Sequence, residues 1–132
     1  MVKISSVIRK ENYKVEITSS SGNVLIADEP EDIGGKDLGF SPNELLAAAL
    51  AACTSATLRM YADRKEWDLK EVKLVVELDY NKESAQTNIR RSITVVGSID
   101  EQQKARLLAV ANACPVHKIL TNRIEIETEL VG

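Results

Sequence analysis

Residues 41–53, SPNELLAAALAAC, join a helix-start signal to a long run of small apolar residues. Ser41 carries a side chain that is preferred at an N-cap, and Pro42 suits the first helical position. Glu44 follows the cap by three residues, which completes a capping box. The pattern predicts one long helix from Ser41 to about Lys65. Its many alanines allow other elements to approach closely, which is typical of a central helix clasped by a sheet or by a partner's helix.

On a helical projection this predicted helix has one apolar stripe and a polar far end. The stripe consists of Leu46, Ala49, Leu50, Cys53, Ala56, Thr57 and Met60. Because Cys53 lies within the stripe, its side chain is expected to face the interior of the protein.

The rest of the chain predicts strands before this helix and a mixture of strands and helices after it. Alternating apolar residues indicate three short strands within residues 2–26 and two longer strands near residues 72–80 and 89–96. An amphipathic helix is expected at residues 100–112, a short helix at 115–120 and a last strand at 124–130. This order predicts an α+β fold with a mainly antiparallel sheet.

Length and composition predict a single domain over residues 1–132, with 44% hydrophobic residues available for a core. The net charge of −3, with basic residues spread along the chain, argues against nucleic-acid binding. The longest apolar run, residues 45–53, is about half of a membrane span, and the N-terminal residues lack the apolar core of a signal peptide. We therefore expect a cytoplasmic protein with no membrane partner.

The chain has two cysteines and one histidine. Cys114 precedes Pro115, so it is predicted to cap a helix, where free N–H groups and the helix dipole lower the pKa of a thiol. His117 lies one turn further on and is placed to add a positive charge or to take a proton. Two Cys and one His fall short of the usual four zinc ligands, so we predict no metal and no cofactor. In a reducing compartment such thiols are expected to be catalytic or inert.

Two motifs, SPNELLAAALAACTS at residues 41–55 and ACPVHKIL at residues 113–120, resemble the osmotically inducible protein C and organic hydroperoxide resistance (OsmC/Ohr-like) family. The resemblance implies an OsmC-like fold, an intertwined homodimer with active sites at its interface, and a thiol peroxidase that reduces organic hydroperoxides in the oxidative stress response. It also implies that Cys53 attacks the peroxide and that Cys114 resolves it. A small dithiol or a dithiol protein then restores both thiols.

The sequence departs from the family pattern in the residues that support the attacking cysteine. The resemblance implies an arginine from an N-terminal loop and a glutamate ten residues before the cysteine, where this chain has Asn43. Glu44 comes nine residues before, about 180° around an ideal helix. No arginine occurs between Arg9 and Arg59, so the candidates are Arg9, Arg59, Arg64 or an arginine from a dimer partner. These differences indicate a less characterised branch of the family.

Two functions remain open at this point. One is a peroxidase with a Cys53/Cys114 thiol-disulfide cycle; the alternative is a non-catalytic dimeric binding protein or redox sensor with an apolar interface pocket. The presence of both cysteines favours the peroxidase, whereas the missing partners favour the alternative. A simpler interpretation treats Cys53 as core packing, Glu44 as a cap and His117 as an ordinary helical residue. The cap argument also permits Cys114 to be the attacking thiol.

Overall fold

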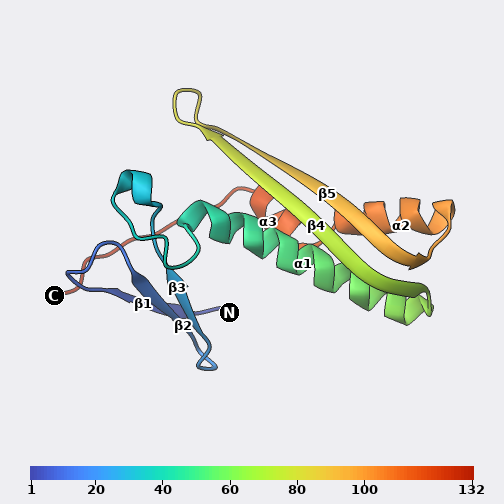
Figure 1. Cartoon of the computed structure of the whole chain (residues 1–132), viewed down its shortest axis with the longest axis horizontal. Helices are drawn as coiled ribbons and strands as arrows, with labels where there is room; N and C mark the ends of the chain where they lie inside the picture. The colour runs from blue at the N-terminus through green and yellow to red at the C-terminus, as the bar shows by residue number, and fades with distance from the viewer. The chain divides into compact units, whose positions relative to one another are not determined.

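A computed structural model describes residues 1–132, and contacts within the chain form two compact units, Met1–Ala47 and Ala48–Gly132. The elements follow the predicted order closely (Figure 1). Antiparallel sheets and a long helix give the α+β fold class that the sequence predicts. The single domain expected over residues 1–132 stays a prediction.

The N-terminal unit contains a three-stranded antiparallel sheet in the order β1-β2-β3. Its strands are β1 (Ile4–Ile8), β2 (Val15–Ser19) and β3 (Val24–Ala27), as the alternating apolar residues predict. A tight turn joins β2 to β3, in which the Asn23 amide donates to the Ser19 hydroxyl at 3.0 Å. A loop with one short 3₁₀ helix, η1 (Glu31–Ile33), then leads to the long helix.

Helix α1 (Pro42–Lys65) has the predicted bounds, and its capping box is present. The Ser41 amide donates to the Glu44 carboxylate at 2.8 Å, and the Glu44 amide donates to the Ser41 hydroxyl at 3.2 Å. These two reciprocal bonds satisfy backbone groups that the first turn would otherwise leave unpaired. They explain locally why the helix starts here.

The buried face of α1 differs from the predicted stripe. The buried residues are Leu50, Thr54, Leu58 and Ala62, whereas Met60 is 61% exposed and Ala49 and Ala56 are also exposed. The stripe prediction was therefore wrong for most of its members, and Cys53 is only partly buried. A helix that is rich in alanine on every side has little amphipathic contrast, so tertiary contacts rather than hydropathy select the face that is buried.

By length and composition alone, α1 is apolar enough to cross a membrane, with a mean hydropathy of 1.3 over its most apolar window. Central helices of folded cores share these properties. Here four α1 residues are buried within the chain itself, so the helix alone does not indicate a membrane protein.

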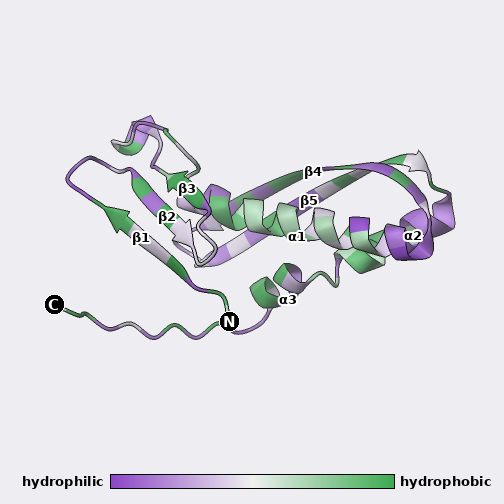
Figure 2. Ribbon diagram, turned by 90° about the horizontal axis from the view of Figure 1, so that it is seen from below, coloured by the Kyte–Doolittle hydropathy of each residue, from purple (hydrophilic) through white to green (hydrophobic).

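The C-terminal unit pairs two long antiparallel strands, β4 (Asp68–Asn81) and β5 (Gln86–Ser98). Both extend several residues beyond the predicted strands, and the hairpin runs beside α1 in Figures 1 and 2. Helix α2 (Glu101–Ala111) places Leu107 and Ala111 in a buried cluster with Leu58 of α1, and inward-facing residues of the hairpin pack against that cluster. A short helix, α3 (Pro115–Thr121), follows.

The strand predicted at residues 124–130 is not formed, because residues 123–132 have no secondary structure. Apolar and polar residues do alternate along this segment, as the colours in Figure 2 show. Ile126 and Leu130 are 84% and 96% exposed. Alternation predicts a strand only where a neighbouring strand supplies hydrogen bonds, and this chain pairs none with the segment.

Candidate active site at the junction of α1 and α3

Cys114 occupies the predicted N-cap of α3, with Pro115 at the first helical position. The extended backbone of Cys114, with ψ at 150°, ends the turn after α2 and starts the new helix. Its side chain is completely buried. The thiol therefore lies inside the protein beside the first amides of α3.

Cys53 projects from the middle of α1 toward the same turn. Its sulfur accepts a hydrogen bond from the backbone amide of Val116 at 3.5 Å, and the hydroxyl of Thr57 lies 4.0 Å away. Val116 is the second residue after Cys114, so the junction of α1 and α3 brings the two motif cysteines together. Both are free thiols, Cys53 partly exposed and Cys114 buried.

An arginine that sequence reasoning missed, Arg91 of β5, lies between these elements. Its Nη1 atom donates to the Thr54 hydroxyl at 2.9 Å and lies 3.9 Å from the Cys114 sulfur. Its Nη2 atom contacts the side-chain oxygen of Asn112 and the Nδ1 atom of His117, each at 3.0 Å. The guanidinium thus joins α1, the turn after α2 and α3 around one thiol.

These neighbours favour the thiolate form of Cys114. Burial opposes ionisation, but the His117 backbone amide, the thiol of Cys53 and the charge of Arg91 outweigh it and lower the pKa of Cys114 below its ordinary value. The His117 amide belongs to the first turn of α3, whereas Cys53 lies on α1 and Arg91 lies on β5. Contacts from three elements, and not the cap alone, therefore supply the effect.

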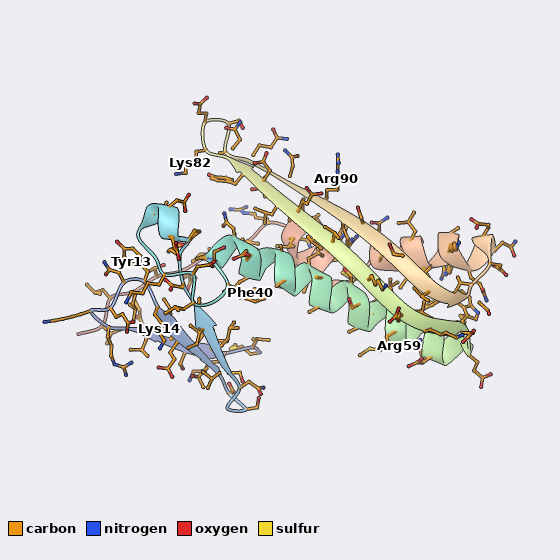
Figure 3. All side chains as sticks on the ribbon, in the orientation of Figure 1. Tyr13, Lys14, Phe40, Arg59, Lys82 and Arg90 are labelled. Atoms are coloured by element: carbon orange, nitrogen blue, oxygen red, sulfur yellow. The ribbon has the colours of Figure 1, made fainter.

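Two of the three arginines named from the sequence, Arg9 and Arg59, are engaged elsewhere. Arg9 pairs with Glu16 at 3.7 Å in the N-terminal unit. Arg59 donates to the backbone carbonyl of Leu69 and pairs with Asp63 at 3.2 Å, where α1 passes β4 (Figure 3).

Arg64 lies exposed in the last turn of α1, and its side chain has no hydrogen bond or ion pair. Glu44 is bound in the capping box. Of the five supporting candidates, only His117 reaches the two-cysteine junction, through Arg91.

No group of three or more His, Cys, Asp or Glu side chains in the chain is arranged to hold a metal ion.

The sequence profile described as OsmC-like protein matches residues 34–129. No curated protein matches the sequence significantly. Among solved structures, a candidate osmotic stress induced and detoxification response protein from Psychrobacter arcticus 273-4 is 25% identical, with a TM-score of 0.80 over 90% of this chain and 88% of that chain.

Two further structures share the fold. An OsmC-like protein from Mycoplasma pneumoniae is 20% identical, with a TM-score of 0.75 over 91% of this chain and 86% of that one. An organic hydroperoxide resistance protein of Bacillus subtilis is 22% identical, with a TM-score of 0.62 over 92% and 90% of the two chains. With a profile match over most of its length and the same fold, this chain belongs to the OsmC-like protein family.

Proposed function

We propose that this protein is a thiol-dependent peroxidase that reduces organic hydroperoxides through a Cys53/Cys114 thiol-disulfide cycle, with a role in defence against oxidative stress. The observation that carries the proposal is the meeting of the two free thiols at the junction of α1 and α3, one partly exposed and the other buried. The exposed thiol meets the peroxide and the buried thiol completes the disulfide. The resemblance to an organic hydroperoxide resistance protein of Bacillus subtilis supports the substrate class.

The cycle balances with a hydroperoxide as oxidant and a dithiol as reductant. The Cys53 thiolate attacks a peroxide oxygen, the O–O bond breaks, and the released alkoxide takes a proton to leave as an alcohol. The Cys114 thiolate then attacks the sulfenic sulfur, and hydroxide leaves as water after taking a proton. A small dithiol or dithiol protein reduces the disulfide by exchange and is itself oxidised to a disulfide.

The surface beside Cys53 suits an organic substrate. Ala49, Ala52, Ala56 and Met60 are exposed along one side of α1, next to the cysteine. We propose that a second copy of the chain covers these four exposed residues in an intertwined homodimer. The interface then forms an apolar pocket at the attacking sulfur. Residues 1–132 then act as one OsmC-like domain of that dimer, in the cytoplasm.

Single cysteine variants test the cycle. With tert-butyl or cumene hydroperoxide and a dithiol, Cys53→Ser should abolish turnover, because the attacking sulfur is gone. Cys114→Ser should consume about one equivalent of peroxide and stall as a sulfenic acid, which a trapping reagent detects. Peptide mapping of the wild type after one equivalent of peroxide should find the two cysteines linked. Peroxide consumption by the wild type no faster than by a Cys53→Ser, Cys114→Ser double variant would exclude the peroxidase.

One observation favours the alternative, a dimeric binding protein or redox sensor without turnover. Within the chain, no cationic side chain hydrogen-bonds to the Cys53 sulfur, whose partners are the amide of Val116, the hydroxyl of Thr57 and the thiol of Cys114. A sensor would form the disulfide with peroxide but would turn over too slowly with any dithiol to deplete the peroxide. Multiple-turnover and single-turnover measurements on the wild type separate the two functions.

A further inference from the structure

Hydrogen bonds hold both terminal nitrogens of the Arg91 guanidinium. Nη1 binds the Thr54 hydroxyl, and that hydroxyl in turn donates to the Leu50 carbonyl at 2.7 Å. Nη2 binds the Asn112 side chain at 3.0 Å. Because a guanidinium is planar and rigid, these two hydrogen bonds fix the position and orientation of the positively charged group.

The contact with Arg91 determines which ring nitrogen of His117 carries the proton. Arginine has donors and no acceptor, so the Nδ1 atom of His117 must accept the bond from Nη2. The imidazole is then neutral with its proton on Nε2. His117 is therefore an orienting partner of the arginine in this arrangement and does not supply the positive charge beside the thiol.

Three titratable or charged groups face Cys114 from the elements packed around it. They are Cys53 of α1, Arg91 of β5 and His117 of α3. Only Arg91 carries a positive charge here, and its Nη1 atom lies 3.9 Å from the sulfur. No acidic side chain hydrogen-bonds or pairs with this guanidinium, so its charge remains available to the thiol.

On the basis of the proposed peroxidase cycle, we propose that Arg91 holds Cys114 ready as the resolving thiolate and as the leaving group when the disulfide is reduced. Thr54, Asn112 and His117 are positioning residues that aim the guanidinium. The two cysteines then have separate tasks: the partly exposed Cys53 meets peroxide and reductant, and Arg91 favours the thiolate form of the buried Cys114 in the two exchange steps.

Thiol-disulfide exchange gives the two cysteines different roles when the disulfide is reduced. An incoming dithiol reaches the partly exposed Cys53 sulfur and not the buried Cys114 sulfur. It forms a mixed disulfide with Cys53, and the electron pair of the broken S–S bond goes to Cys114. A leaving thiol of lower pKa departs faster, so the charge of Arg91 assists reduction as well as resolution.

A thiolate titration in the Cys53→Ser background tests the pairing without any peroxide. Only one thiol then remains, and its ultraviolet absorbance reports ionisation as the pH rises. Arg91→Gln should raise the midpoint by about one pH unit, because it removes the neighbouring positive charge. Arg91→Lys should retain part of the effect. Arg90→Gln is the matched control: it makes the same change at the next position of β5, on the side turned away from α1 (Figure 3), and should leave the midpoint unchanged.

A second variant tests the same pairing in case Arg91→Gln does not fold. Asn112 is exposed, so Asn112→Ala should fold normally while it frees one end of the guanidinium. Its midpoint should move in the same direction as that of Arg91→Gln, by a smaller amount. Equal midpoints in the parent, Arg91→Gln and Asn112→Ala proteins would overturn the proposal.

Kinetics in the otherwise wild-type protein test the role in the cycle. Near neutral pH, Arg91→Gln should slow the decay of the Cys53 sulfenic acid about threefold, since a tenfold loss of thiolate is partly offset by the higher nucleophilicity of a more basic thiol. During reduction, the trapped mixed disulfide should map to Cys53, and an adduct on Cys114 would overturn the proposal.

The titration and the turnover measurements separate this proposal from the peroxidase function. A titration midpoint that depends on Arg91, in a protein without turnover, would exclude the peroxidase function but keep Arg91 as the residue that favours the Cys114 thiolate. Normal turnover together with an unchanged titration midpoint in Arg91→Gln would keep the peroxidase function and exclude Arg91 as the residue that favours the Cys114 thiolate.

Discussion

At the scale of single residues, Asp28 organises the loop that leads from β3 to α1. Its carboxylate is only 2% exposed and accepts backbone N–H bonds from Tyr13, Glu29, Lys36 and Leu38. Burial opposes ionisation, but these four donors outweigh it and lower the pKa of Asp28 below its ordinary value. The ionised side chain therefore serves as a template around which the loop closes.

The lowered pKa of Asp28 predicts a pH-dependent contribution to stability. Because the folded-state pKa lies below the unfolded one, this contribution is complete above the unfolded pKa and is lost as the pH falls through the folded pKa. Asp28→Asn should destabilise the protein at neutral pH and flatten the acid limb of its unfolding profile. Denaturant unfolding at several pH values measures both effects. Asp32→Asn, at an exposed position of the same loop, is the control; an equal effect of both variants would contradict the prediction.

At the scale of elements, the start of α1 depends on the reciprocal bonds between Ser41 and Glu44. Ser41→Ala should lower the free energy of unfolding by about 1 kcal/mol, because it leaves the Glu44 amide without its hydroxyl partner. Chemical denaturation measures this change. Ser84→Ala, in the exposed turn between β4 and β5, should have almost no effect, and equal losses for the two variants would argue against the capping role.

At the scale of the whole molecule, the apolar residues that remain exposed in one chain predict a homodimer. They include Met60 on α1 and Ile126 and Leu130 in the unpaired C-terminal segment. An intertwined partner would cover α1 and offer the segment a strand to pair with. Obligate interfaces of this kind bury on the order of 2,000 Å² or more.

Light scattering should therefore give the mass of two chains at micromolar concentration. Met60→Glu should increase the monomer fraction, because it places a charge on the side of α1 that the partner would cover. Glu83→Lys, at the exposed tip of the β4–β5 hairpin, should leave the mass unchanged. A wild-type protein that stays monomeric would contradict the homodimer and, with it, the interface pocket.

Local sequence signals were sufficient for most elements of this fold. The bounds of α1 follow from Ser41, Pro42 and Glu44, and the start of α3 follows from Cys114 and Pro115, because caps act within one helical turn. Period-two alternation likewise located all five strands that form. The same alternation at residues 124–130 failed, because pairing requires an edge that no local pattern supplies.

The environment of the thiols was decided by tertiary structure. Arg91 stands in β5 at a position where its neighbours on the same face, Ile89 and Ile93, are apolar and partly buried. A charge in such a row was a signal available in the sequence, since a charged side chain on an inward face needs partners. Those partners, Thr54 and Cys114, lie 37 and 23 residues away along the chain. Only the packing of β5 against α1 and α3 brings them together, and a contact of that range leaves no trace in local spacing.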